Sequence, residues 1–264
     1  MPDKLTALIL GDIYGSPGLR ALFVGLASLK QNHKADIVIV NGENAADGLG
    51  IFVSQAEQLF SIGVDAITSG NNIWHRKEIE PMLDSDQPII RPANYPSGTP
   101  GKGFTIVEVK SAAVGIINLQ GREHMRSIDC PFKVGRDLAR KLHDKTKIII
   151  VDFHAESPAE KESLSFYLDG QVSALIGTHT HVQTADEKIL PKGTAYISDI
   201  GMTGPVDSVI GSSKEISVQR SLSQMPLKME VSENTAVIEG VKIDIDVDTG
   251  RALSIERIRH HSIV

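Results

Sequence analysis

Short apolar runs rich in valine and isoleucine alternate with segments of helical periodicity over the first two thirds of the chain. This alternation is typical of βαβ units, in which parallel strands share a sheet that is covered by helices. The pattern predicts strands at residues 5–10, 36–40, 66–68, 104–109, 114–119, 147–153 and 172–176. It predicts helices at residues 19–33, 55–62, 75–83, 134–143 and 159–168. The fold class that follows is α/β.

The last third of the chain has a different pattern. Residues 227–231 and 235–247 alternate between apolar and polar side chains, which predicts antiparallel strands after a short helix at 216–222. We expect a second sheet that packs on the first. With 264 residues and 41% hydrophobic content, the chain can bury a large core, and we expect one domain over residues 1–264.

Charge and cysteine content narrow the range of partners. The formal net charge of -6 argues against a surface that binds long nucleic acids, because such a surface neutralises phosphates with lysine and arginine. One cysteine, Cys130, cannot form an intrachain disulfide. The sequence shows neither a secretory signal nor an apolar run of ~20 residues. We therefore expect a soluble, cytoplasmic protein with no membrane partner, and homo-oligomers are compatible with the sequence.

Several predicted strands end in a residue that can bind a metal ion. Because parallel strands bring their carboxyl ends to one edge of the sheet, these residues can converge on one pocket. The set mixes carboxylates, amides and imidazoles, which suits two divalent cations better than a closed zinc site rich in cysteine. The predicted ligands are Asp12, Glu43, Asn44, Asn71, His154, His179 and His181.

Other roles for single members of this set stay open. Asp12 could cap the helix that follows it, Glu43 could be a surface charge, and Asn71 could be a turn residue. The segment Gly177-Thr178-His179-Thr180-His181 favours the metal interpretation, because two histidines two apart can face one site if the backbone leaves the strand there. Two divalent ions about 3.5 to 4 Å apart convert water to hydroxide and hold the oxygens of a phosphoryl group. The residues thus predict a dinuclear hydrolase of phosphate esters.

Longer motifs resemble a known family. The strand-end residues resemble the blocks of calcineurin-like metallophosphoesterases, and six segments resemble the bacterial YmdB-like branch of that superfamily. These segments are residues 41–46 (NGENAA), 91–94 (RPAN), 118–122 (NLQGR), 152–156 (DFHAE), 179–186 (HTHVQTAD) and 201–205 (GMTGP).

The resemblance implies a four-layer α/β/β/α sandwich of two mixed sheets. It implies a phosphodiesterase that uses a metal-bridging hydroxide on small substrates such as cyclic AMP, and a centre of two iron or manganese ions, with zinc or magnesium as alternatives. Glu43 would bridge both ions. By position, Asp12, Asn44 and His181 would complete one set of ligands, and Asn71, His154 and His179 would complete the other.

One departure from the family pattern affects catalysis. The family has Gly-Asn-His-x-Trp-Asp, with the histidine as proton donor, whereas Asn72 follows Asn71 here. Loss of a general acid costs ~10²- to 10⁴-fold in rate. Either His75 supplies the proton, or water does, or the protein binds metals and nucleotides as a regulator with little turnover. A phosphomonoesterase is a third functional hypothesis.

Three further residues are candidates for contact with substrate. Arg91 and Arg122 could hold a phosphate, since a guanidinium pairs well with phosphate oxygens, and either could instead form a structural ion pair. Thr180 lies between two predicted ligands and could touch substrate or stabilise its turn. Asp152 and Glu156 are expected to orient His154 rather than to act on substrate.

Overall fold

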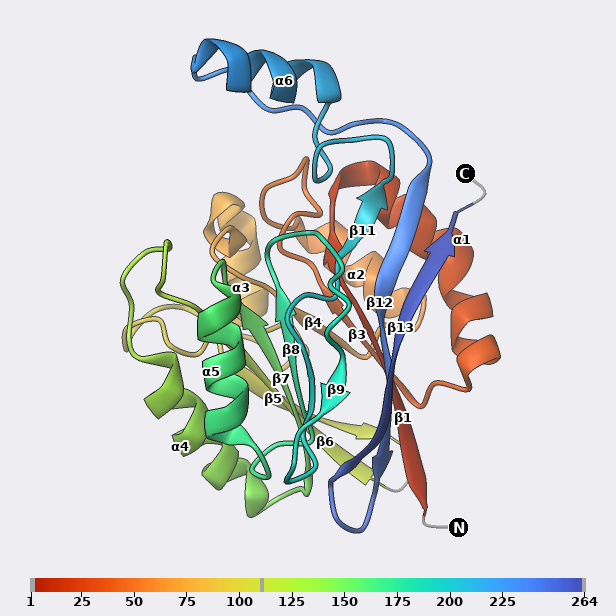
Figure 1. Ribbon diagram of the computed structural model, residues 1–264, viewed down its shortest axis with the longest axis vertical. Coiled ribbons are helices and arrows are strands. Elements are labelled where there is room, and N and C mark those ends of the chain that lie inside the picture. The colour runs from red at the N-terminus through yellow and green to blue at the C-terminus, as the bar shows by residue number, and fades with distance from the viewer. Residues whose placement is uncertain (1–2, 110–111, 263–264) are drawn as a thin grey trace.

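Two mixed β-sheets pack face to face in the computed structural model, which describes residues 3–109 and 112–262 (Figure 1). The first sheet has the order β2-β11-β12-β1-β3-β4, and β13 also pairs with β12. Its strands are β1 (Lys4–Leu10), β2 (Asp12–Ile13), β3 (Ile37–Asn41), β4 (Ala66–Thr68), β11 (Met202–Pro205), β12 (Ala236–Asp246) and β13 (Ala252–His261). Strands β1, β3 and β4 are parallel, and β12 is antiparallel to β1.

The second sheet has the order β5-β6-β7-β8-β10-β9. Its strands are β5 (Phe104–Val109), β6 (Ala112–Gln120), β7 (Ile148–His154), β8 (Ala174–Thr178), β9 (Lys188–Ile189) and β10 (Ala195–Ile197). Strands β6, β7, β8 and β10 are parallel, and β5 and β9 are antiparallel additions at the two edges.

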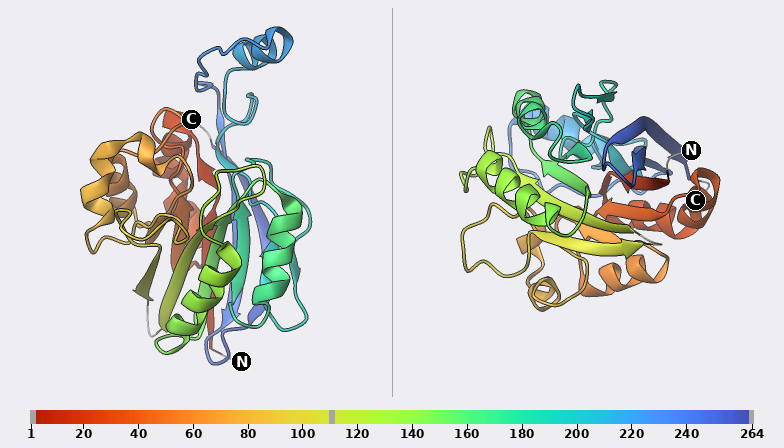
Figure 2. Two further views of the ribbon diagram at one scale, coloured as in Figure 1. Left: turned by 90° about the vertical axis from the view of Figure 1, so that its left-hand side faces the viewer. Right: turned by 90° about the horizontal axis from the view of Figure 1, so that it is seen from below.

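Helices cover the outer face of each sheet (Figure 2). The first sheet is covered by α1 (Gly15–His33), α2 (Val53–Ser61) and α3 (Glu80–Leu83), and the second by α4 (Pro131–His143) and α5 (Pro158–Leu168). Along β1, Leu8 and Leu10 pack toward the helices, whereas Leu5, Ala7 and Ile9 pack between the sheets. This alternation follows from the two-residue period of a strand. The predicted four-layer α/β/β/α sandwich is confirmed.

The C-terminal strands differ from the prediction in their pairing. Strand β12 joins β1 in the first sheet, so the second sheet is built from the middle of the chain, beginning at β5. Residues 227–231 do not form a strand, and only Val231 makes a β-bridge, to Ser212. This segment runs beside α6 (Lys214–Ser223), away from both sheets, where it has no strand to pair with (Figure 1).

The predicted helix at 75–83 is wrong in extent. Two 3-10 turns, η1 (Ile73–His75) and η2 (Lys77–Ile79), precede the short α3, which begins one residue before Pro81. Proline fits the first turn of a helix but would remove a hydrogen bond in the interior of a longer one. The helix therefore cannot extend unbroken from residue 75.

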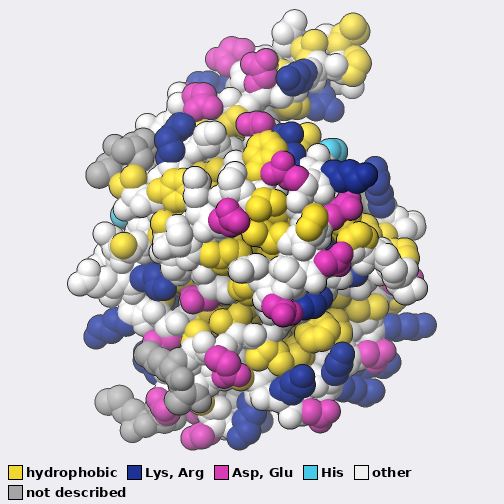
Figure 3. Space-filling model, turned by 180° about the vertical axis from the view of Figure 1, so that it is seen from behind, with side chains coloured by type: hydrophobic (Ala, Val, Ile, Leu, Met, Phe, Trp, Pro, Cys, Tyr) yellow, Lys and Arg dark blue, Asp and Glu magenta, His cyan; other side chains and the backbone are white. Residues whose placement is uncertain are grey.

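Residues 206–235, between β11 and β12, form an arm that stands out from the body and carries α6 (Figure 1). Apolar side chains gather at the tip of the arm in Figure 3, and α6 includes Leu222, which is 82% exposed. On the face of the body in that view, acidic and basic side chains are interspersed. None of the helices within residues 3–109 and 112–262 combines the length and the apolar character that a membrane span requires.

Candidate metal centre and adjoining cavity

The carboxyl ends of strands from both sheets meet at one place. Asp12 begins β2, Glu43 follows β3, and Asn71 follows β4, all in the first sheet. His154 ends β7 and His179 follows β8, both in the second sheet. The expected convergence at the carboxyl ends of parallel strands thus occurs between two packed sheets rather than along one.

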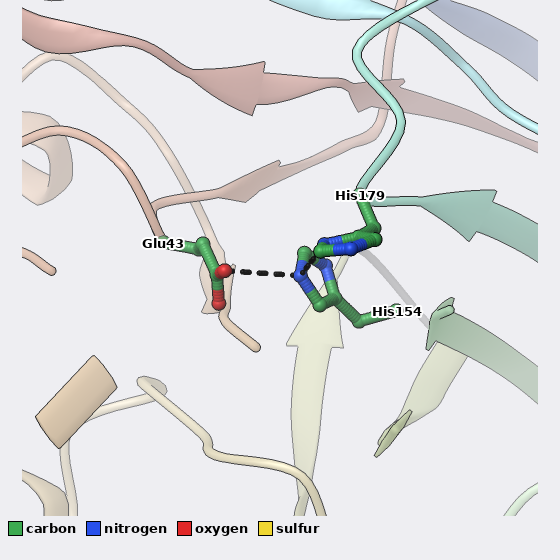
Figure 4. A group of neighbouring side chains, drawn as sticks. All are labelled: Glu43, His154 and His179. Carbon is green, nitrogen blue, oxygen red and sulfur yellow. Dashed lines mark hydrogen bonds and ion pairs between the residues drawn. The ribbon is translucent and has the colours of Figure 1, made fainter. Parts of the chain in front are cut away.

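Glu43, His154 and His179 form the centre of this group. Nε2 of His154 lies 3.0 Å from Oε1 of Glu43 and 3.0 Å from Nδ1 of His179. One ligand atom from each residue lies within 4.8 Å of the other two. The carboxylate and the two imidazoles face one another in Figure 4. Three donor atoms of the types that divalent cations accept therefore surround one point.

Gly70 makes room for this centre. A Cβ atom at Gly70 would collide with the carboxylate of Glu43 and the ring of His154. The glycine of the Gly-Asn motif is therefore required by space, because its backbone passes directly against the two side chains.

Buried polar residues fix the ring of His154. Its Nδ1 lies 2.9 Å from Oγ1 of Thr178, which in turn donates a 2.8 Å hydrogen bond to Asp152. The same carboxylate accepts a 3.0 Å bond from Nδ2 of Asn41 and a bond from Thr68. Asp152 therefore acts on His154 through Thr178. Glu156 differs from the expectation, because its carboxylate lies 3.2 Å from Nε2 of His179 and orients that ring instead.

The histidine loop after β8 has an uncommon backbone. His179 and His181 have φ angles of 97° and 63°, in the left-handed region that non-glycine residues rarely occupy. Asp199 holds the loop, since its Oδ2 accepts hydrogen bonds from the backbone N–H of Thr180 at 3.1 Å and from its hydroxyl at 2.8 Å. Lys161, almost fully buried, pairs with the same oxygen at 2.9 Å. The backbone bend after β8 is therefore formed at His179 and His181, rather than at a glycine.

The side chain of Asn72 connects Glu43 with its neighbours Asn44 and Asn71 through hydrogen bonds. Its Nδ2 donates to Oε1 of Glu43 at 2.9 Å and to Oδ1 of Asn44 at 3.0 Å. Nδ2 of Asn71 donates to Oδ1 of Asn72 at 3.1 Å. The amide of Asn44 also lies 2.9 Å from Nε2 of His181. Asn44 and His181 thus form a second, adjoining pair of candidate ligands.

The donor atoms fit divalent cations. Asp12 Oδ1 and Asn71 Oδ1 are buried oxygens that have no hydrogen-bond partner among the described residues. Burial raises the pKa of both Asp12 and Glu43 to about 7, and no lysine or arginine of the described chain forms an ion pair with either. Burial lowers the pKa of His154 and of His179, the latter to about 4, so both imidazoles are neutral, the form that ligates metals. A cation would neutralise the buried carboxylates and occupy the unpaired oxygens.

A cavity of about 790 Å³ adjoins the centre. One wall consists of Glu43, Asn44, Asn72, His179, Thr180 and His181. The arm supplies a second wall, which includes Arg220, Gln224, Met225 and Met229. This second wall could not be predicted from the sequence, because the arm residues follow no strand end and match none of the motifs that the chain carries.

Three of the residues considered for catalysis or substrate binding lie elsewhere. The guanidinium of Arg91 donates to the carbonyls of Pro92, Thr99 and Pro100 at 2.8, 3.1 and 3.2 Å, so it holds its own loop together. Arg122 lines a separate cavity beside α5, where its guanidinium donates to Cys130. His75 is exposed and does not line the cavity next to the metal centre. Thr180 lines that cavity, with its hydroxyl bonded to Asp199.

Known proteins resemble this chain over nearly its whole length. The model of a family described as "YmdB-like protein" matches residues 8–258. A 2',3'-cyclic-nucleotide 2'-phosphodiesterase of Bacillus subtilis is 45% identical over 95% of each chain. A putative phosphatase/phosphodiesterase of Mycoplasma pneumoniae is 37% identical over 98% of this chain and 94% of its own.

Two solved structures share the fold at similar identity. The crystal structure of a hypothetical protein from Thermus thermophilus is 38% identical, with a TM-score of 0.91 over 98% of this chain and 100% of its own. A novel phosphatase from Mycoplasma pneumoniae is 36% identical, with a TM-score of 0.93 over 99% of this chain and 95% of its own. The resemblance drawn from the motifs is therefore confirmed, and the chain belongs to the YmdB-like family.

Proposed function

We propose that this protein is a metal-dependent phosphodiesterase that hydrolyses small cyclic phosphodiesters, with 2',3'-cyclic nucleotides as the first substrate class and cyclic AMP as the second. The observation that carries the proposal is the meeting of Glu43, His154 and His179 beside a cavity large enough for a nucleotide. We place 2',3'-cyclic nucleotides first because the Bacillus subtilis relative is named a 2',3'-cyclic-nucleotide 2'-phosphodiesterase.

Two divalent cations are proposed as cofactors, with iron or manganese favoured over zinc and magnesium. Glu43 would contact both; Asp12, Asn44 and His181 would complete one site, and Asn71, His154 and His179 the other. Bound there, the cations would supply a nucleophile from water near neutral pH and offset the charge of the phosphate.

The side chains of the protein perform the remaining tasks. Thr178 and Asp152 keep the ring of His154 turned toward Glu43. Asn72 lines the cavity, and its side-chain amide donates to Glu43 and Asn44, but this amide has no titratable proton to give to the leaving oxygen. Protonation of that oxygen by water is the arrangement the geometry favours, since His75 does not line the cavity.

Asn72 also supports a second candidate function. A protein that binds a nucleotide at this centre and cleaves it slowly would act as a regulator. The phosphatase named in Mycoplasma pneumoniae supports a third, hydrolysis of phosphomonoesters. The three functions differ in which leaving groups and which esters are turned over.

One set of assays tests the three functions. Protein purified without added metal is first analysed for its elements, and two metals per chain are expected. It is then assayed with bis(4-nitrophenyl) phosphate, whose leaving group needs no acid, with 2',3'- and 3',5'-cyclic AMP, and with 4-nitrophenyl phosphate. Turnover of a cyclic nucleotide that is lost on chelation supports the proposal. Nucleotide binding without turnover indicates the regulator, and turnover of the monoester alone indicates the phosphomonoesterase.

Two matched variants test whether metal content and activity depend on the candidate metal centre. His154→Ala removes a buried candidate ligand, and His143→Ala removes an exposed histidine at the end of α4. We expect His154→Ala to lower metal content and activity together, and His143→Ala to leave both unchanged. Equal metal content in the two variants would exclude His154 as a ligand.

A further inference from the structure

We propose that the arm (residues 206–235) forms a binding site for the base of a nucleotide substrate, with the guanidinium of Arg220 against the base. This inference rests on the proposed function and specifies how the substrate is held. It assigns to α6, which takes no part in the sheets, a role in selecting nucleotides over simpler phosphodiesters.

The size of the cavity gives the first reason. A phosphodiester group at the metal centre occupies a small part of about 790 Å³. Sites for whole small molecules have volumes of about 300 to 1,000 Å³. The same cavity has candidate ligands such as Glu43 and His179 on one wall and residues of α6 on the other. A ligand bound by its phosphate at the centre would therefore extend toward the arm.

The charge of Arg220 gives the second reason. Among the described residues that line the cavity, Arg220 is the only lysine or arginine, and no described carboxylate forms an ion pair with it. A guanidinium without an acidic partner is free to contact a ligand. Its flat face stacks on nucleobases, and its N–H groups donate to their polar edges.

The neighbours of Arg220 suit an aromatic ring. Met225 and Met229 line the same wall, and their flexible thioethers adapt to flat rings and make favourable sulfur contacts with them. Ile210 adds apolar surface from the start of the arm. The wall thus combines a planar cation with apolar side chains, a composition that tolerates different bases because it recognises the ring faces.

An unpaired hydroxyl in the same wall gives an independent reason. Ser217 of α6 lines the cavity and is 8% exposed, and its Oγ has no hydrogen-bond partner in the described part of the chain. Buried hydroxyl groups are usually paired. A polar edge of the base or sugar would supply the missing partner.

The test compares two substrates with the same five-membered cyclic phosphate, 2',3'-cyclic AMP and glycerol 1,2-cyclic phosphate, which has no base. For Arg220→Ala we expect kcat/KM for the nucleotide to fall about 10-fold and kcat/KM for the glycerol ester to stay within about 2-fold of the parent value. Calorimetric titration of the metal-loaded protein with 2',3'-cyclic AMP should show a similar loss of affinity. The control is Lys214→Ala, which removes a cation of the same helix that pairs with Asp207 at 2.6 Å and does not line the cavity.

The outcomes separate this inference from the proposed function. If the parent protein hydrolyses both esters and Arg220→Ala loses both equally or neither, the base site is refuted and the phosphodiesterase stands. If the parent hydrolyses neither ester but Arg220→Ala still weakens nucleotide binding, the phosphodiesterase is refuted and the base site stands. A loss with Lys214→Ala as large as that with Arg220→Ala would also refute the base site, because it would show a nonspecific effect of charge.

Discussion

Oγ1 of Thr178 lies 2.9 Å from Nδ1 of His154, at the carboxyl end of two paired strands. The single hydroxyl proton of Thr178 is donated to Asp152 at 2.8 Å, so the same oxygen can only accept from His154. Nδ1 of His154 therefore carries the proton, and Nε2, which faces Glu43 and His179, has a free lone pair. The polar partners of the ring thus select the tautomer that can ligate a metal.

The first prediction concerns this contact. Thr178→Val keeps the shape of the side chain and removes the hydroxyl, so we expect metal affinity to fall about 10- to 100-fold. Titration with manganese against a competing chelator measures the change. Thr178→Ser keeps the hydroxyl and should bind metal nearly as tightly as the parent. Equal affinity in the valine and serine variants would show that the hydroxyl does not orient the ligand.

The second prediction concerns the missing proton donor. Asn72 lines the cavity beside Glu43, so Asn72→His would place a titratable group in the cavity next to the candidate metal centre. We expect the ratio of turnover for cyclic AMP to that for bis(4-nitrophenyl) phosphate to rise by about 10-fold or more, because only the former needs an acid. His75→Ala should leave the ratio unchanged, since His75 is exposed outside the cavity. A drop in the ratio with His75→Ala would identify it as the donor.

The convergence of residues at the candidate metal centre could be predicted from the sequence because they stand at the ends of strands. Asp12, Glu43 and His154 each follow or end an apolar run, and the parallel pairing of such runs places their ends together. The alternation of strands and helices predicts an α/β fold with a second packed sheet, and the four-layer order follows from the resemblance of the motifs to the family. The motifs added the family, which the comparisons confirm.

The remaining features depend on three-dimensional contacts that no local sequence pattern predicts. The guanidinium of Arg91 donates to carbonyls up to nine residues away in its own loop, although an arginine side chain could equally well bind a phosphate. Arg220 reaches the cavity only because the arm brings α6 to the same cavity as the candidate metal ligands. Strand β12 pairs with β1 from more than 200 positions along the chain, a choice between two sheets that periodicity cannot make.

The third prediction concerns the histidine loop. Lys161 and Asp199 form a buried ion pair, each 1% exposed, that also binds Thr180 between His179 and His181. Lys161→Met leaves the carboxylate buried without its cation, so we expect the free energy of unfolding to fall by about 3 to 5 kcal/mol. Chemical denaturation in the presence of chelator measures this change without a contribution from bound metal.

The matched control is another lysine and acid pair at the surface. Lys188 lies 2.7 Å from Glu162, but their side chains are 40% and 48% exposed. Lys188→Met should therefore cost no more than about 1 kcal/mol. Similar costs for the two methionine variants would mean that the buried pair does not stabilise the loop.

The last prediction concerns pH and a carboxylate away from the metal centre. Burial opposes ionisation of Asp186, but hydrogen bonds from Ser198 and Thr184 outweigh it and hold the pKa of this carboxyl below its ordinary value. A carboxyl with a lowered folded-state pKa stabilises the fold above its unfolded pKa, near 3.9, and this stabilisation is lost as pH falls through the folded value. Asp186→Asn removes the titrating group while keeping its shape.

We therefore expect the difference in unfolding free energy between the parent and Asp186→Asn to be constant from pH 7 to about 5 and to shrink as the solution is acidified below pH ~4. Denaturant titrations with chelator at each pH measure it. A difference in unfolding free energy that grows on acidification would contradict this prediction, because it would mean that the folded state raises the pKa of Asp186.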